Sequence, residues 1–433
     1  MVIDSRKVEP GGVFIATKGA TVDGHTFIPD VAAKGALGVV CEKAPSGCDI
    51  PYILVKDSFQ ALKDIAEYYR KQLAIPVVGI TGSVGKTSTK EFIAAVLAAK
   101  YRVLKTEGNF NNEIGLPLTV LSIREEHEVA VLEMGISDFG EMHRLSKIAR
   151  PDLCVMTNIG QSHLENLGSR EGILRAKSEI FDFMNPDGCV IVNGDDDLLC
   201  NMEKRGNRPI IHFGRNASNE FFASNVESRG LSGNSVVIHG ERKAFPVEIP
   251  LPGDHMILNA LAAAAVGMQM GLSPEEIARG ISRVEIVSGR GNVVQTPFYT
   301  LIDGSYNSNP GSVKAAVQML TLAFERKVAL LGDMFELGEQ KEQLHREAGA
   351  YAVEQGIDVL VCAGELARHI YEGARDCEKK MKNGNKTQVF YFESMDEMIG
   401  NLPQILKKGD AVLVKASHAM QFEKAVEWLK KAI

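Results

Sequence analysis

The sequence predicts an α/β fold with three domains, of which the central one is a doubly wound, mostly parallel sheet. Short apolar runs alternate with longer amphipathic runs over most of the 433 residues, a pattern typical of strands and helices in a parallel sheet. A glycine-rich turn follows the apolar run 77–80 and precedes a helix-forming segment, as in a phosphate-binding loop. A polar, strand-rich stretch at 208–250 interrupts the alternation, which resumes near residue 290. We therefore expect domains at residues 1–74, 75–290 and 291–433.

The composition is that of a globular protein with a large hydrophobic core. Hydrophobic residues make up 45% and charged residues 24% of the chain, which are ordinary values. The net charge is −7 and no basic stripe with interleaved aromatic residues occurs, so we expect no nucleic-acid partner. The seven cysteines form no Cys-x-x-Cys pair, which indicates reduced thiols in the cytoplasm. The most apolar helix, expected over 257–272, is too short and too polar for a membrane span.

The first 74 residues predict a small α/β unit. Apolar runs at Val13–Ala16 and Gly38–Cys41 predict strands, and segments 28–34 and 59–72 predict helices. The junction at residues 74–76 follows the second helix, so we place the first domain boundary there.

The central feature of the chain is a strand, a glycine-rich turn and a helix at residues 77–100. The pattern Gly-x-x-Gly-x-x-Gly-Lys-Thr is met in full at 79–87, whereas the more common spacing requires glycine at Ile80. Backbone N–H groups in such a loop converge on an anion, which the helix dipole also favours. We expect Lys86 to contact phosphate and the Thr87 hydroxyl to ligate Mg²⁺. The residues of this loop expected at the nucleotide are Gly82, Ser83, Val84, Gly85, Lys86, Thr87 and Ser88.

Further candidate residues follow the strands expected at 129–132 and 153–158, since ligands gather at the carboxyl ends of strands in such sheets. Glu133 follows the first of these strands, where a carboxylate can reach a Mg²⁺ held by Thr87. The alternative is a surface carboxylate at a strand end. His163 follows the second strand. Because Mg²⁺ prefers oxygen ligands, His163 fits a metal ligand and a hydrogen-bonding loop residue equally well.

Other polar residues of the central region have simple structural explanations. Asp195–Asp197 follows the strand expected at 189–193 and fits the first turn of a helix. Lys177 lies in an amphipathic segment and fits a solvated helix face. His255 and Asn259 are four residues apart and share a helix face. The carboxamide of Asn259 suits either an adenine edge or a buried cap.

The C-terminal third predicts a second open α/β sheet. Strands are expected at 299–302, 328–331, 359–362 and 412–415, and helices at 312–323 and 342–355. Arg290 lies in a glycine-flanked hinge before this region, and the polar loop 303–310 follows its first strand. Across an interdomain cleft, such a loop can contact the same nucleotide from the opposite side. The preferences of turns for glycine, asparagine and proline explain those residues of the loop. They do not explain the whole run 303–310.

The chain resembles the Mur ligases over nearly its whole length. The stretches that carry this resemblance are 82–88, 106–115, 303–310 and 331–338, the last being the most specific. The resemblance implies a uridine-nucleotide domain, a phosphate-binding-loop ATPase domain and a C-terminal Rossmann-like domain for nucleotide and incoming dipeptide. It implies an ATP-dependent ligase that adds D-alanyl-D-alanine to UDP-N-acetylmuramoyl-tripeptide through an acyl phosphate. It further implies two Mg²⁺ ions and a cytoplasmic monomer.

The same resemblance assigns roles to individual residues. Catalysis is implied for Lys86, Lys177 and His163, and metal binding for Thr87, Glu133, His163 and Lys177. Lys177 matches a lysine that the family carries as a carbamate, which would turn a cation into an anionic oxygen ligand. Asn259 matches an adenine contact, and Arg290 and Asp303 match a clamp on phosphate and ribose. Substrate contacts are implied for Ser5, Arg6, Asn109, Asn111, Asn112, Tyr306 and Asn307. The run 415–418 has histidine where relatives often have arginine, at a position that the resemblance assigns to the dipeptide carboxylate.

Two alternatives of different kinds remain. A nucleotide-switch protein requires a guanine-reading Asn-Lys-x-Asp, but the run Asn385–Gln388 lacks the aspartate. Another ligase on the same scaffold would add a diamino acid to the dipeptide precursor, or glutamate to folate. The diamino-acid ligases usually carry an Asp-Asn-Pro-Arg loop, which this chain lacks. The run 331–338 favours the dipeptide ligase.

Overall fold

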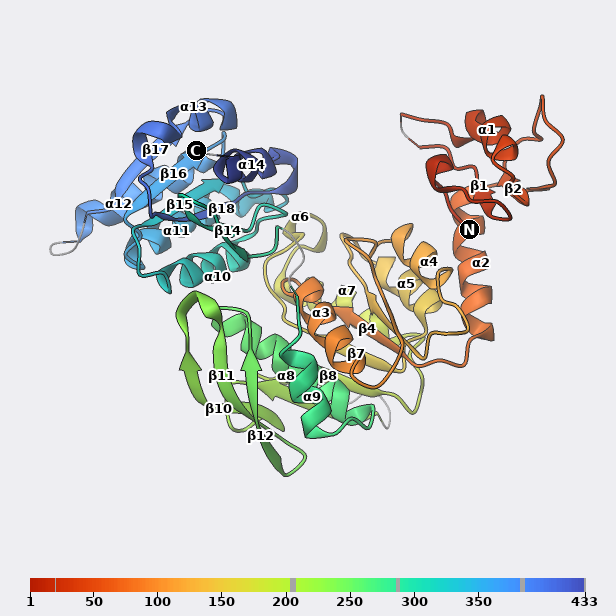
Figure 1. Cartoon of the computed structure of the whole chain (residues 1–433), viewed down its shortest axis with the longest axis horizontal. Coiled ribbons are helices and arrows are strands. Elements are labelled where there is room, and N and C mark those ends of the chain that lie inside the picture. The colour runs from red at the N-terminus through yellow and green to blue at the C-terminus, as the bar shows by residue number, and fades with distance from the viewer. Residues whose placement is uncertain (20, 203–207, 286–288, 382–385, 432–433) are drawn as a thin grey trace.

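The computed structural model describes residues 1–19, 21–202, 208–285, 289–381 and 386–431, which form three α/β units, each built on its own sheet (Figure 1). Asn385, the first residue of the asparagine–lysine run considered above, lies outside the described residues. The predicted three-domain α/β fold is confirmed. Its boundaries at residues 74 and 290 stay predictions.

The N-terminal unit is a parallel sheet of three short strands, β1 Val13–Ile15, β2 Gly38–Cys41 and β3 Tyr52–Leu54. Helix α1 Ile28–Ala33 covers the sheet with Val31 in the core, and α2 Ser58–Gln72 leads to the next unit. The sequence did not predict β3, because all three of its side chains are exposed and carry no core pattern.

The central sheet has nine strands in the order β12-β11-β10-β9-β8-β7-β4-β6-β5. The parallel part comprises β4 Val77–Thr81, β5 Val103–Lys105, β6 Val129–Glu133, β7 Leu153–Met156, β8 Cys189–Asn193 and β9 Ile210–Gly214. The polar stretch at 208–250 extends the same sheet with β10 Phe221–Ser228, β11 Asn234–Gly240 and β12 Lys243–Ile249. Strand β4 lies between β6 and β7 and is fully buried, so the loop that follows it starts from a rigid position.

Helices cover both faces of this sheet because successive strand side chains point to opposite sides. Val78 and Ile80 pack with α3 Lys86–Leu97, α8 Asp254–Gln269 and α9 Pro274–Ile281. Val77 packs on the other face. That face carries α4 Gly115–Val120, α5 Glu141–Ala149, α6 Leu164–Leu167 and α7 Arg170–Ser178. The predicted doubly wound architecture therefore has one apolar core on each side of β4.

The interpretation of Asp195–Asp197 as a helix start is wrong. The run lies in turns after β8, where the carboxylates accept hydrogen bonds from other segments. Asp195 Oδ1 accepts from Asn219 Nδ2 at 3.0 Å, and Asp196 Oδ2 accepts from the Ile159 N–H at 2.8 Å. These contacts tie the end of β8 to the loops after β9 and β7, while Asp196 Oδ1 also accepts from the Leu198 and Leu199 N–H groups in a turn that does not continue into a helix.

The C-terminal unit is a six-stranded sheet in the order β13-β14-β18-β15-β16-β17. Its strands are β13 Asn292–Gln295, β14 Thr300–Asp303, β15 Lys327–Gly332, β16 Val359–Ala363, β17 Gln388–Phe392 and β18 Ala411–Lys415. One face carries α10 Pro310–Thr321, α11 Lys341–Glu354 and α12 Ala367–Lys380, and the other carries α13 Met395–Ile405 and α14 Glu423–Lys431. All pairs are parallel except β13–β14.

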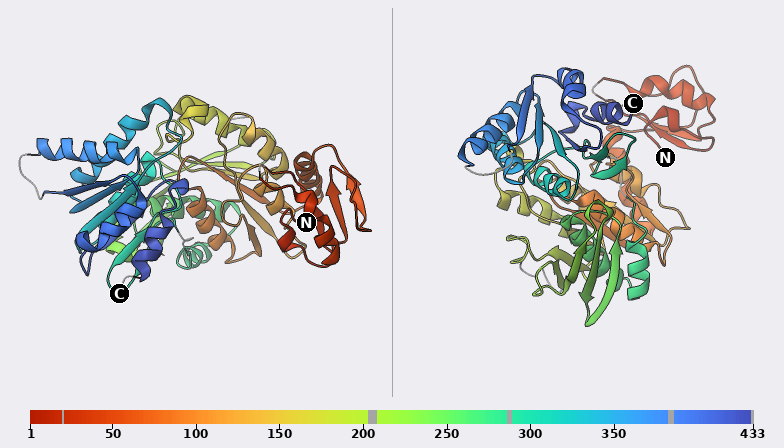
Figure 2. Two further views of the ribbon diagram at one scale, coloured as in Figure 1. Left: turned by 90° about the horizontal axis from the view of Figure 1, so that it is seen from above. Right: turned by 60° about the vertical axis from the view of Figure 1, so that its left-hand side comes forward.

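The first and last units lie at opposite ends of the molecule with the central unit between them (Figures 1 and 2). Leu231, at the tip of the β10–β11 hairpin, packs against the core of the C-terminal unit. Asn309 Nδ2 donates to Ser162 Oγ at 3.2 Å across the same boundary. None of the helices in the described part of the chain has the length and apolar character needed to cross a membrane.

Candidate active site

The glycine-rich loop runs from the end of β4 into the first turn of α3. Gly82 and Gly85 have φ angles of 148° and 84°, which favour glycine. A Cβ atom at residue 82 would lie 1.9 Å from Thr157 Oγ1, so only glycine fits there. The loop after β7 therefore approaches the glycine-rich loop at a distance that no side chain allows.

Hydrogen bonds from the same neighbouring loop hold the glycine-rich loop in place. The Val84 N–H donates to Asn158 Oδ1 at 2.9 Å, and the Gly160 N–H donates to Ser83 Oγ at 2.9 Å. Lys86 folds back over its own loop, and its Nζ donates to the Gly82 carbonyl at 2.8 Å. Burial lowers the pKa of Lys86, which Glu133 partly offsets. These hydrogen bonds therefore fix both the glycine-rich loop and the position of the Lys86 side chain.

Glu133 ends β6 beside this loop and is 1% exposed, so the surface-carboxylate alternative is wrong. Its Oε2 accepts from Thr87 Oγ1 at 2.7 Å, and its Oε1 accepts from Asn111 Nδ2 at 2.8 Å. A hydroxyl and a carboxylate oxygen held together are hard donors of the kind that Mg²⁺ prefers. Within the described ranges, no group of three or more His, Cys, Asp or Glu side chains could hold a metal. The pair Thr87 and Glu133 fits Mg²⁺ whose other ligands are phosphate and water oxygens.

His163 caps α6 with a φ of 59°, in the left-handed region. Its Nδ1 lies 2.7 Å from Oε2 of Glu336, which belongs to the C-terminal unit. The side chain also lines the cavity described below. The contact with Glu336 was not anticipated from the sequence, because nothing in either run indicates that the two loops meet.

Lys177 lies in α7 and is 1% exposed, so the solvated-face interpretation is wrong. Burial, with a smaller effect from the charge of Lys86, lowers the pKa of Lys177 well below its ordinary value. No carboxylate within the described residues forms an ion pair with it. Burial therefore shifts this side chain towards the uncharged amine.

Asn259 connects α8 to α3. Its Oδ1 accepts from Thr89 Oγ1 at 2.9 Å, and its Nδ2 faces Met256 Sδ at 3.5 Å. The side chain is nearly buried. This position beside the start of α3 accounts for the residue structurally, and the adenine contact stays a prediction.

The C-terminal unit, together with Arg290 just before it, contributes a group of polar residues to the cavity. The guanidinium of Arg290 lies over the ring of Tyr306, 4.0 Å from its centroid. Asp303 Oδ1 accepts from Ser305 Oγ at 2.7 Å. Lys415 Nζ, at the end of β18, donates to the Asn307 carbonyl at 2.8 Å.

A cavity of about 580 Å³ lies between the central and C-terminal units. Of the predicted residues, its lining includes Ser83, Val84, Gly85, Lys86, Ser88, Asn111, Asn112, Glu133, His163, Arg290, Tyr306 and Asn307. Gly82, Thr87, Lys177, Asn259 and Asp303 are buried or nearly buried and do not belong to the described lining. Residues far apart in sequence, which were predicted to bind phosphate and substrate, thus line one cavity.

The expected substrate residues divide into two groups. Asn112 lies at the cavity, where its Oδ1 accepts from the Gly115 N–H at 2.9 Å at the start of α4. Ser5, Arg6 and Asn109 are not part of the described cavity lining. The Arg6 side chain is 87% exposed and pairs with Asp4 at 2.8 Å.

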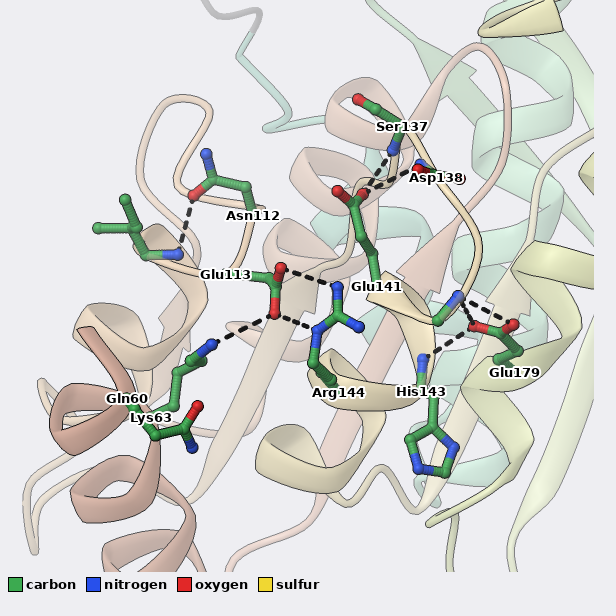
Figure 3. Close-up of polar contacts among 12 residues, drawn as sticks. Gln60, Lys63, Asn112, Glu113, Ser137, Asp138, Glu141, His143, Arg144 and Glu179 are labelled. Carbon is green, nitrogen blue, oxygen red and sulfur yellow. Dashed lines mark hydrogen bonds and ion pairs between the residues drawn. The ribbon is translucent and has the colours of Figure 1, made fainter. Parts of the chain in front are cut away.

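The N-terminal unit is joined to this side of the site through Glu113, a residue that the sequence analysis did not single out. Glu113 accepts from Arg144 Nη2 at 3.0 Å and lies 3.6 Å from Lys63 Nζ of α2 (Figure 3). Glu113 lines the cavity. The carboxylate therefore links helix α2 to the wall of the cavity.

The fold and the site define a nucleotide-binding enzyme whose reaction space lies between two α/β units. The chain belongs to the Mur ligase family. Residues 1–77 match the description "Mur ligase family, catalytic domain", residues 80–267 "Mur ligase middle domain" and residues 282–418 "Mur ligase, glutamate ligase domain". The resemblance drawn from the sequence motifs is confirmed.

Individual relatives match over nearly the whole chain. A protein of Bacillus subtilis (strain 168) named UDP-N-acetylmuramoyl-tripeptide–D-alanyl-D-alanine ligase is 39% identical, covering 98% of this chain and 91% of the relative. Among solved structures, MurF from Acinetobacter baumannii superposes with a TM-score of 0.89 at 32% identity, covering 100% and 93% of the two chains. MurF ligase from Thermotoga maritima in complex with ADP has a TM-score of 0.85 at 30% identity, with coverages of 99% and 96%.

Proposed function

We propose that this chain is the ATP-dependent ligase that adds D-alanyl-D-alanine to UDP-N-acetylmuramoyl-tripeptide in peptidoglycan precursor synthesis. The observation that carries the proposal is its similarity, over 98% of its length, to a relative named for this reaction. ATP phosphorylates the tripeptide carboxylate and leaves ADP. The amine of the dipeptide then attacks the acyl phosphate, an amide forms and phosphate leaves.

The loop residues act on the transferring phosphoryl group. Backbone N–H groups of residues 82–88 and the Lys86 ammonium stabilise its negative charge. Thr87 and Glu133 would hold Mg²⁺, together with His163 on the cavity wall. The metal supplies charge neutralisation at the phosphate oxygens. The hydrogen bond from Thr87 Oγ1 to Glu133 Oε2 at 2.7 Å supports this role, because it already holds the two oxygens next to each other.

The remaining residues bind and orient the two substrates. Asn259, Arg290 and Asp303 would contact adenine, phosphate and ribose of the nucleotide. Arg290 and Tyr306 support this role because their stacked side chains lie on the cavity. The residues that would contact the UDP-muramoyl peptide and the dipeptide are Ser5, Arg6, Asn109, Asn111, Asn112, Tyr306 and Asn307.

Lys177 would act as a carbamate. An uncharged amine can add to CO₂, forming an N–C bond and releasing one proton, and the product is an anion that could serve as a metal ligand. The burial and lowered pKa of Lys177 support this proposal, since they favour the uncharged, reactive amine over the ammonium. A lysine left as an ammonium in this position would instead repel both Lys86 and the metal.

We also place the reaction in the cytoplasm. The seven cysteines are all unpaired, which agrees with a reducing compartment.

The test is a panel of radiolabelled amino acids and dipeptides, supplied with ATP and UDP-muramoyl peptides of increasing length. We expect labelled product and ADP only when D-alanyl-D-alanine is combined with the tripeptide precursor. Transfer of a diamino acid to the dipeptide precursor, or of glutamate to folate, would overturn the proposal. Lys86→Ala protein prepared in parallel controls for contaminating ligases.

A further inference from the structure

Lys415 is a buried lysine on the cavity wall to which the roles above assign no chemistry. It ends β18 and is 6% exposed. Its Nζ donates to the carbonyl of Asn307 at 2.8 Å and to that of Gly304 at 3.4 Å. Among the residues described, no carboxylate forms an ion pair with it. The side chain lines the same cavity as Lys86 and Glu133.

Two carbonyl acceptors match the hydrogen-bonding capacity of a neutral amine. A neutral amine has two N–H donors and one lone pair, whereas an ammonium group has three N–H donors and no lone pair. When both N–H groups of neutral Lys415 donate to Gly304 and Asn307, the lone pair occupies the remaining position. Since the side chain lies on the cavity wall, that position is available to a molecule bound there.

Burial makes this form accessible. The pKa of Lys415 is lowered to about 8, mainly by burial and to a smaller extent by the charge of Arg290, while Asp303 raises it. The nearby imidazole of His255 is itself held neutral, because burial lowers its pKa to about 4. Neutral and protonated lysine therefore both occur near physiological pH, which suits a group that gains and loses a proton.

We propose that Lys415 accepts the proton of the incoming dipeptide ammonium, so that the amine reaches the acyl phosphate with a free lone pair. This inference rests on the proposed function. An α-amino group has a pKa of about 8 and is mostly protonated at pH 7, and a protonated nitrogen cannot attack. Lys415 comes from the unit to which the dipeptide-binding role is assigned, and it lines the same cavity as Lys86 of the glycine-rich loop.

The proton balance is simple. The N–H bond of the ammonium breaks, its electron pair stays on nitrogen and a new N–H bond forms at Lys415 Nζ. The amine then forms the amide bond, and the bond between the acyl carbon and the phosphate oxygen breaks. The second proton of the nitrogen leaves with phosphate, and Lys415 returns its own proton to solvent.

The experiment separates proton transfer from phosphate binding by changing the nucleophile. Hydroxylamine is uncharged at pH 7 and traps the acyl phosphate as a hydroxamate without needing a base. We expect Lys415→Met to lose about tenfold in dipeptide ligation at pH 7, because only about a tenth of the dipeptide amine is neutral there, while keeping hydroxamate formation near that of the wild-type enzyme. Ligation by this variant should recover as the pH rises to 9, where the dipeptide amine is already neutral.

Two further variants make the result specific. Lys415→Arg keeps a cation that can donate to the same carbonyls but cannot accept a proton, so it should resemble Lys415→Met. Lys408→Met removes an exposed lysine shortly before β18 and should behave as wild type. Thermal melting and ADP binding establish that each variant folds and binds nucleotide.

The outcomes are distinct. Wild-type protein that forms no dipeptide product refutes the proposed function itself. Wild-type ligation together with normal ligation by either Lys415 variant at pH 7 overturns the proton-acceptor role. Equal loss of hydroxamate and amide formation overturns it as well, because Lys415 would then serve the phosphoryl group or the loop fold.

Discussion

The Nδ1 atom of His163 lies 2.7 Å from a carboxylate oxygen of Glu336, across the boundary between the central and C-terminal units. Both residues have left-handed backbone angles, with φ of 59° and 62°. Since Nδ1 is engaged by the carboxylate, Nε2 is the ring nitrogen left to face a ligand. A carboxylate on the second ring nitrogen commonly orients a histidine that binds metal.

Glu336 is presented by a loop that the C-terminal unit holds firmly. The Met334 N–H donates to His345 Nε2 at 2.9 Å, and the Phe335 N–H donates to Ser417 Oγ at 2.9 Å. Glu336 can therefore reach His163 only when the two units are docked as they are here. The orientation of one candidate metal ligand thus depends on the arrangement of the units.

Glu336→Ala should lower Mg²⁺ affinity and turnover by about tenfold or more, because His163 loses the group that orients it. The melting temperature should change little, since the Glu336 side chain is 61% exposed and exposed ion pairs contribute little stability. Mg²⁺ titrations of nucleotide-bound protein and steady-state rates measure the effect. Glu339→Ala, an exposed carboxylate three residues away, is the matched control. Equal behaviour of the two variants would rule out an orienting role.

Lys86→Ala should reduce ligation by about 10²–10³-fold, because it removes a charge that stabilises the transferring phosphoryl group. The loop should keep its shape, since Ser83, Val84 and Gly160 hold it through hydrogen bonds that do not involve the lysine. ADP release and thermal melting are the measurements. Near wild-type turnover in a normally folded variant would contradict the role assigned to the loop.

Asn259→Ala tests whether this residue serves the nucleotide or only the packing of α8 on α3. A nucleotide role predicts a higher KM for ATP with little change in the KM for the dipeptide. Loss of the 2.9 Å hydrogen bond from Thr89 should also cost about 1 kcal/mol of stability. Thr89→Val removes the same bond and leaves the carboxamide, so it serves as the control. If both variants change all kinetic constants alike, Asn259 is structural.

Local pattern was enough to predict the scaffold of the site. The strand at 77–80, its glycine-rich turn and the following helix were predicted with ends within a few residues of β4 and α3. Glu133 and His163 were found because polar residues after buried strands meet at one edge of a parallel sheet. The same rule could have singled out Lys415, which ends a predicted strand.

Contacts between distant segments could not be predicted in this way. The pairing of His163 with Glu336 depends on how two units dock, and the bonds from Lys415 cross from β18 to a loop 108 residues earlier. Lys177 was assigned to a solvated face because an amphipathic period shows which side of a helix is polar. That period does not show that the glycine-rich loop and its lysine lie near the polar side.

Lys177 gives a prediction about stability as well as activity. In CO₂-free buffer its native pKa lies well below the ordinary value of 10.5. At pH values between the native pKa and the ordinary pKa of Lys177, the unfolded chain binds more protons at this residue than the native protein does. Lys177 therefore makes the free energy of unfolding increase with pH. Lys177→Met removes that contribution, and its melting temperature should exceed that of the wild type near pH 7 and approach it as the pH rises towards 10. A variant with the same pH slope as the wild type would show that burial does not hold the amine neutral.

The carbamate itself is tested by the alanine variant and by CO₂. Lys177→Ala should be nearly inactive and partly rescued by acetate, whose carboxylate can replace the lost ligand oxygens. Wild-type activity should fall in bicarbonate-depleted buffer and return when bicarbonate is added, because the carbamate forms only from the free amine and CO₂. The mass added at Lys177, measured under CO₂, reports the modification directly. A fully active alanine variant, or an unmodified amine in CO₂-equilibrated active enzyme, would leave Lys177 as a buried lysine without a role in metal binding.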